Sequence, residues 1–156
     1  MMKLIDDIDA LDLKGDDVKI DDMDINELFK RGVESLIYGY VNLGYLKLKK
    51  VLEENPDYLE PITNDHPYRY LGDIYHRYGK VEDALKLYEK ALSIDPNDVH
   101  VMIDIGFLYV SMGEYQKAID EFEYILKNKE FEGLIPNQDL LKEAIENAKK
   151  ALKKEE

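Results

Sequence analysis

The chain has 156 residues, a hydrophobic fraction of 45% and a formal net charge of −13. This length suits one folding unit with a buried core, and the balance of apolar and charged residues is typical of a folded protein. The absence of cysteine excludes disulfides, thiol nucleophiles and cysteine-ligated metals. The acidity argues against nucleic acid or an anionic membrane as a partner, because both attract clustered basic residues.

Residues 1–24 form an acidic arm in which apolar residues recur at helical spacing. Leu4, Ile5, Ile8 and Leu11 stand among many aspartates, a pattern that predicts a short amphipathic helix. The arm lacks the uninterrupted apolar stretch of a secretory signal, and the chain has no run of about 20 apolar residues. We therefore expect a cytoplasmic protein that does not bind membranes.

The following residues, 25–156, repeat themselves and are expected to form a single helical domain. LGDIYHRYG at 71–79 aligns with IGFLYVSMG at 105–113 at an offset of 34, and LIYGYVNLG at 36–44 joins them at an offset of 35. The glycines that coincide are Gly44, Gly79 and Gly113. Apolar residues recur every three or four positions on both sides of these glycines. Each unit is therefore predicted to be two amphipathic helices joined by a glycine turn.

This pattern predicts an all-α fold. Helices are expected at residues 25–42, 45–54, 66–78, 81–94, 98–112, 115–128 and 138–154. Gly72 and Ala84 are expected where the two helices of one unit cross, because a bulky side chain there would push the helices apart. The last helix follows Asn137, a suitable N-cap, and its apolar face should cover the end of the stack.

Residues 65–132 resemble two tetratricopeptide repeats, a family with a 34-residue period and the pattern aromatic, Leu-Gly, Tyr, Ala, Phe and then Pro. The matching residues are Tyr68, Leu71, Gly72, Tyr75, Ala84, Tyr88, Ala91 and Pro96, then Met102, Ile105, Gly106, Tyr109, Ala118 and Phe122. The resemblance implies an α-α superhelix of antiparallel helix pairs, with repeats at about 30–64, 65–98 and 99–132 and a capping helix at 137–154. The N-terminal copy departs from the pattern, with Ile37 in place of a small residue and Pro56 inside its second helix.

No arrangement of residues points to catalysis. The chain has no Walker sequence, no G-x-G-x-x-G, no EF-hand loop and no Ser/His/Asp arrangement. His66, His76 and His100 are too far apart on the predicted helices to share a metal, so we interpret them as residues of the groove surface. We expect neither an enzyme nor a bound metal or other cofactor.

In proteins of this family, the first helices of the repeats line a concave groove that holds a segment of a partner. The resemblance therefore implies a non-catalytic scaffold or adaptor that binds a peptide segment of another protein. The matching residues are Arg31, Glu34, Ser35, Tyr38, Asn42, His66, Arg69, Tyr70, Asp73, Arg77, His100, Ile103, Asp104, Phe107 and Ser111. The aromatic residues among them are either exposed anchors or packed between helices.

One subclass of the family grips a partner's terminal carboxylate with basic and amide side chains. The corresponding residues here are Glu34, Tyr38, Tyr70, His100 and Asp104. Two of them are acids that would repel a carboxylate. A chaperone C-terminus is therefore not the expected partner.

An alternative hypothesis is a structural or self-assembling subunit, a homo-oligomer included, whose groove is occupied by its own arm. The arm is acidic, and the expected groove face carries Arg31, Arg69 and Arg77 together with the histidines. An arm docked there would compete with a partner that is itself acidic and amphipathic. The opposing interpretation is that the arm is a solvated tail.

Overall fold

The computed structural model describes residues 22–155. The arm's predicted amphipathic helix lies outside these residues. The described residues form helices and no strand, which confirms the all-α prediction. In chain order the helices are α2 (Ile25–Ile37), α3 (Val41–Glu54), α4 (Pro67–Arg77), α5 (Val81–Ile94), α6 (Val99–Ser111), α7 (Tyr115–Lys127), the 3₁₀ helix η2 (Lys129–Leu134) and α8 (Gln138–Glu155).

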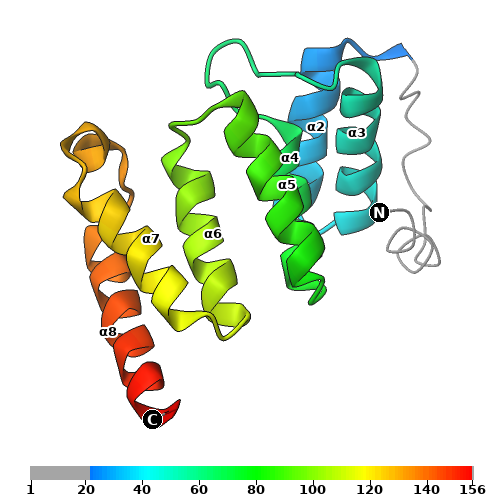
Figure 1. The fold of residues 1–156 in the computed structure, drawn as a ribbon. Helices are drawn as coiled ribbons and strands as arrows, with labels where there is room; N and C mark the ends of the chain where they lie inside the picture. Colours follow the sequence, from blue (N-terminus) through cyan, green and yellow to red (C-terminus); the bar gives the residue numbers. More distant parts are fainter. Residues whose placement is uncertain (1–21, 156) are drawn as a thin grey trace.

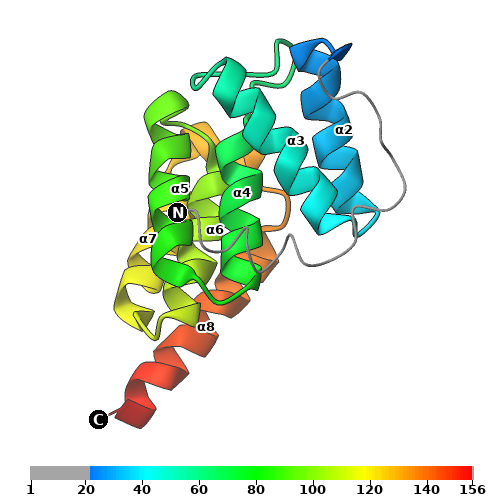
Figure 2. The ribbon, with the colours of Figure 1, turned by 90° about the vertical axis from the view of Figure 1, so that its right-hand side faces the viewer.

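Three antiparallel hairpins, α2/α3, α4/α5 and α6/α7, stack side by side, and α8 packs on α7 at the end of the stack (Figure 1). Neighbouring hairpins meet mainly through α3 with α4 and through α5 with α6. Figure 2 shows that the C-terminal end of α8 projects past the other helices. The arrangement is an α-α superhelix. In the part of the chain that is described, every helix is too short or too polar to span a bilayer.

Each hairpin turns on one glycine. Gly39, Gly79 and Gly113 have φ angles of 86°, 76° and 75°, in the left-handed region that a side chain disfavours. The residue after each glycine donates its amide to a carbonyl five residues earlier, over 2.8 to 2.9 Å. The same turn is therefore built three times from the same chemistry.

The turn of the first hairpin is at Gly39, so the alignment that placed it at Gly44 was wrong. α2 ends at Ile37 rather than at residue 42. Gly44 lies inside α3, where a Cβ would come within 2.5 Å of Leu36 Cδ2. Its role is that of Ala84 in the second hairpin, a small residue that lets the two helices approach.

The first repeat precedes the second by 40 residues, because six extra residues lie between them. The crossing glycines Gly32 and Gly72 are 40 residues apart, whereas Gly72 and Gly106 are 34 apart. Pro56, which was expected inside a helix, follows the end of α3 and stands 40 residues before Pro96. The predicted register of the first repeat is thus shifted by five residues.

At each crossing a glycine of the first helix faces a large side chain of the second. The distances from an added Cβ are 2.9 Å to Leu48 from Gly32, 2.6 Å to Tyr88 from Gly72 and 2.4 Å to Phe122 from Gly106. Heavy atoms do not approach a real Cβ so closely, so each of these positions excludes a side chain. The prediction of a tight crossing is correct, but a buried ring, not Ala84, is the closest neighbour of Gly72.

The extra residues lie in the loop between α3 and α4, which closes around Glu60. The Glu60 carboxylate accepts hydrogen bonds from the Thr63 amide at 2.6 Å and the Thr63 hydroxyl at 2.9 Å. The bond from the Thr63 backbone is the main reason that the pKa of Glu60 is lowered. Tyr58 ties the loop to α2, since its ring centroid lies 5.2 Å from that of Phe29 and its hydroxyl donates to Asn26 Oδ1 at 2.8 Å.

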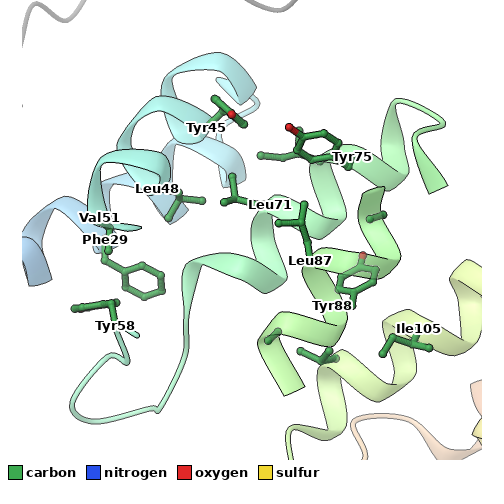
Figure 3. Packing of buried hydrophobic residues seen from close by; sticks show 14 of the residues in the cluster. Phe29, Tyr45, Leu48, Val51, Tyr58, Leu71, Tyr75, Leu87, Tyr88 and Ile105 are labelled. Atoms are coloured by element: carbon green, nitrogen blue, oxygen red, sulfur yellow. The ribbon is translucent and has the colours of Figure 1, made fainter. Parts of the chain in front are cut away.

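One hydrophobic core runs from α2 to α6. Figure 3 shows Leu71 of α4 between Leu48 of α3 and Leu87 of α5, so that two hairpins share this core. Tyr88 of α5 continues the core toward Ile105 of α6. The hairpins are therefore joined by continuous apolar packing.

A second core lies between α6, α7 and α8. Phe122 and Ile125 of α7 are buried in it together with Leu141 and Ile145 of α8. Asn137 Oδ1 accepts the Leu140 amide at 3.1 Å, which confirms the predicted N-cap. The last helix thus covers the apolar face that α7 would otherwise expose.

Candidate functional site

The predicted groove residues of the second and third repeats lie on α4 and α6, which contact each other directly. Near the N-terminal ends of these two helices is a hollow of about 440 Å³, here called the polar hollow. It is lined by Thr63, Asn64, Asp65, Arg69, Asp95, Asn97, Asp98, Val99, His100 and Leu134. The loop between α3 and α4 supplies one wall, and the residue that ends η2 supplies part of another.

His66 is fully buried, so its assignment to the groove surface was wrong. Its Nε2 lies 3.2 Å from Oδ2 of Asp98, the N-cap of α6, and this contact holds the ring between α4 and α6. Burial opposes ionisation of Asp98, but hydrogen bonds from His66 and the Val101 amide outweigh it and lower the pKa of Asp98. His66 therefore links the second repeat to the third.

Arg69 makes a second contact between the same two helices, α4 and α6. Its Nε donates to Asp104 Oδ2 at 3.3 Å, and its guanidinium carbon lies 5.4 Å from the centre of the Tyr70 ring. Burial lowers the pKa of Arg69, but the Asp104 carboxylate and neighbouring groups raise it more, so the guanidinium stays charged. Tyr70 donates its hydroxyl to Asp65 and packs edge-on against Phe29, with centroids 6.0 Å apart.

A third contact joins the C-terminal ends of α4 and α6. His76 Nε2 and Ser111 Oγ are 2.7 Å apart. On the same face of α6, the Phe107 ring packs against Phe122, with centroids 5.0 Å apart. Of the aromatic candidates, Tyr70 and Phe107 therefore pack between helices, whereas Tyr38 is exposed.

Asp73 and Asp104 form a partly buried acid pair near Arg69. Asp73 accepts a hydrogen bond from the Tyr88 hydroxyl of α5. Burial raises the pKa of Asp104 to about 7, with a further rise from Asp73 and an opposing effect of Arg69. Burial also raises the pKa of Asp73, against the Tyr88 hydrogen bond and Arg69. The pair therefore binds a proton at a higher pH than two exposed aspartates would.

The pH dependence of stability tests this acid pair. In the unfolded chain Asp104 titrates near 3.8 and in the folded chain near 7, so its contribution to stability is full below 3.8 and is lost as pH rises through 7. Asp104→Asn cannot ionise. From about pH 4 to about pH 8 its stability relative to the wild type should rise by about 4 kcal/mol, since the rise of the Asp104 pKa from 3.8 to about 7 corresponds to that free energy. Urea unfolding followed by circular dichroism at both pH values measures the difference, and an equal difference at both would contradict it.

The predicted groove residues of the first repeat do not occupy the repeat positions that were assigned to them, because the register of this repeat is shifted. Arg31 pairs with Glu27 on α2 at 3.1 Å, and Glu34 is exposed on the same helix. Ser35 is buried and accepts a hydrogen bond from Lys47 Nζ at 3.1 Å. Two further candidates lie beyond α2, Tyr38 in the turn and Asn42 in α3.

Counted from the crossing glycine, the first-repeat residues equivalent to the α4 candidates are Asn26, Phe29, Lys30, Val33 and Ile37. Five positions were compared above with the subclass that grips a terminal carboxylate. At two of them the corrected register places Phe29 and Val33 instead of Glu34 and Tyr38. Phe29 is buried in the core. The five positions contain no lysine, arginine or asparagine, so a carboxylate clamp is still absent.

The remaining candidates divide between surface and core. Arg77 and His100 are exposed, whereas Ile103 packs against the second core. The polar hollow brings together Arg69 and His100 with residues that the repeat pattern did not indicate, chiefly Asp95 and Leu134. Within residues 22–155, no three histidine or acidic side chains are placed to hold a metal ion.

Comparison with known proteins identifies the repeats. Residues 72–113 match the family model described as TPR repeat. The chain is 30% identical over 119 residues to a TPR repeat-containing protein of Methanocaldococcus jannaschii, which covers 76% of this chain and 20% of that protein. It is 30% identical over 70 residues to the Hsp70-Hsp90 organising protein of Plasmodium falciparum, which covers 45% of this chain and 12% of that protein. The chain thus spans a fifth or less of the length of these relatives.

The fold is similar to that of solved structures. A structure of MamA superposes with a TM-score of 0.63 at 24% identity, covering 85% of this chain and 66% of that one. A MamA mutant, D159K, gives the same TM-score over 86% of this chain and 67% of the other. With the repeated glycine turns and tight crossings described above, these findings show that the chain is a tetratricopeptide-repeat protein.

Proposed function

We propose that the protein is a scaffold or adaptor, without catalysis of its own, that binds a peptide segment of another protein at the polar hollow. The tetratricopeptide repeats support a role in protein interaction in general. The observation that carries the more specific proposal is the hollow itself, because it lies on the α4 and α6 face and has the concave shape that a bound segment needs. Its rim combines the exposed His100 with the exposed, apolar Leu134.

The charge of the polar hollow favours a segment with lysine or arginine. Asp65, Asp95 and Asp98 line it, and the only arginine in its lining, Arg69, is engaged with Asp104. A basic side chain would complement these carboxylates, whereas the acidic segment expected earlier would be repelled. Leu134, which is 56% exposed, would contact an apolar residue of the segment beside the basic one.

A peptide library displayed on phage and selected on the purified protein tests this proposal. The expected result is enrichment of peptides that carry lysine or arginine beside an apolar residue. Leu134→Lys should weaken their binding about tenfold or more, because it removes the apolar contact and adds a like charge. The matched control is Leu140→Lys, since Leu140 is 46% exposed on α8 and does not line the hollow.

Fluorescence anisotropy with the enriched peptides measures these affinities. Peptides that bind Leu134→Lys and Leu140→Lys equally well would place binding elsewhere on the protein. Enrichment of acidic peptides would contradict the proposed charge preference.

A further inference from the structure

The turn between α2 and α3 exposes an apolar patch, here called the turn patch, that consists of Ile37, Tyr38 and Tyr40. Their side chains are 74%, 75% and 65% exposed. Single exposed apolar residues are common on protein surfaces, but adjacent large ones mark sites where another segment packs.

The corresponding turns of the other two hairpins each keep one apolar side chain, Tyr78 or Met112, at the position of Tyr38, but lack the other two. Counted from the turn glycine, the equivalents of Ile37 and Tyr40 are Arg77 and Lys80 in the second hairpin. In the third hairpin they are Ser111 and Glu114. The backbone of the turn is the same in all three, so its geometry does not require apolar side chains. The first turn therefore differs in chemistry alone, as expected of a surface that is covered.

The segment that precedes the described residues has the matching pattern. Residues 4–11 contain Leu4, Ile5, Ile8 and Leu11 at helical spacing. Residues 1–21 hold seven aspartates and three lysines, whereas α2 and α3 together hold five basic and four acidic residues. The first hairpin therefore does not repel an acidic segment.

The chain is long enough to bring this segment to the turn patch. The described residues begin just before α2, and the patch lies at the other end of that helix, about 20 Å away along 13 residues. The ten residues from 12 to 21 can span about 33 Å when extended. The apolar residues of 4–11 can therefore reach the patch without any change in the repeats.

We propose that residues 4–11 dock on the turn patch of their own chain. The alternative of an arm in the groove is weaker than the sequence suggested, since Arg77 and His100 alone among the positive candidates of α4 and α6 are exposed. His66 and Arg69 are engaged with aspartates of the next repeat, and His76 contacts Ser111. Docking on the turn patch is independent of the proposed peptide binding, because the polar hollow lies between α4 and α6.

A single spin label tests the docking. Since the chain has no cysteine, Ala10→Cys allows one nitroxide to be attached to the full-length protein. In a ¹⁵N-labelled sample, the amides of residues 37–41 should lose most of their intensity by paramagnetic broadening. The amides of the equivalent turn at Gly113, two hairpins away, should lose much less.

A double substitution provides the matched control. Tyr38→Ser with Tyr40→Ser changes only exposed side chains, so the repeats should stay folded while the broadening at residues 37–41 disappears. Tyr78→Ser in the second turn should leave the broadening unchanged. If the labelled protein with Tyr38 and Tyr40 intact showed no broadening at residues 37–41, or showed broadening of α4 and α6 instead, the proposal would be overturned.

A mixed sample separates contact within a chain from contact between chains. Unlabelled protein that carries the nitroxide is combined with ¹⁵N-labelled protein that does not. No broadening is expected in this mixture. Broadening at residues 37–41 would show that the arm of a second copy occupies the patch and would overturn docking within one chain.

Discussion

Replacing Gly106 by leucine should lower the free energy of unfolding by about 3 kcal/mol, because it overpacks a crossing that has no room for a side chain. A Cβ at this position would come within 2.4 Å of the Phe122 ring. That ring is fully buried and packs against Phe107, so moving it aside would disturb the second core. Gly72→Leu should behave in the same way against Tyr88. Chemical unfolding followed by circular dichroism measures both changes.

The control for these substitutions is Gly133→Leu. Gly133 is exposed in η2, and a Cβ there would meet no atom within 4 Å. The free energy of unfolding of this variant should stay close to that of the wild type. If Gly106→Leu were tolerated as well as Gly133→Leu, the close approach of α6 and α7 would be refuted.

Removal of α8 should expose the second core and cause aggregation or loss of the helical signal. In the intact protein, Leu141 and Ile145 of α8 cover Phe122 and Ile125 of α7. A terminal repeat needs such a cover, because its neighbour would otherwise present an apolar face to water. Light scattering and circular dichroism of a chain that ends at residue 136 would show the effect. A soluble truncation with the helical content of the remaining helices would contradict it.

A point substitution tests the same contact without removing the helix. Leu141→Ala should destabilise the protein by about 2 to 5 kcal/mol, because it leaves a cavity in the second core. Leu140→Ala, at the adjacent and about half-exposed position, should have little effect. Equal melting temperatures for the two variants would show that α8 does not depend on this packing.

The sequence predicts the second and third repeats well, because their small residues follow one period. Gly72 and Gly106 mark the crossings and Gly79 and Gly113 the turns, each pair 34 residues apart. The first repeat was misaligned because an inserted loop shifts it to a spacing of 40 residues. The sequence did contain a signal for the correct alignment, since the Tyr-Gly pair ending at Gly39 and the proline that follows the second helix both recur after 40 residues.

The side-chain pairing on α4 and α6 could not be predicted from the repeat pattern. Repeat positions indicate which residues face the concave side, but not which of them bond to the neighbouring repeat. His66 and Arg69 occupy such positions and are both engaged with carboxylates of the next repeat. Leu134 was missed for another reason, since it lies in η2, outside any repeat, and reaches the polar hollow only through the folding of the chain.

The inserted loop between α3 and α4 also bears on how a partner could be positioned. A regular array offers the same surface at every repeat, so an extended ligand can slide by one period and find equivalent contacts. Thr63, Asn64 and Asp65 break this translational symmetry, because they line one wall of the polar hollow and the spacing between the next repeats leaves no room for a second copy of them. A ligand held there would have one binding register instead of several.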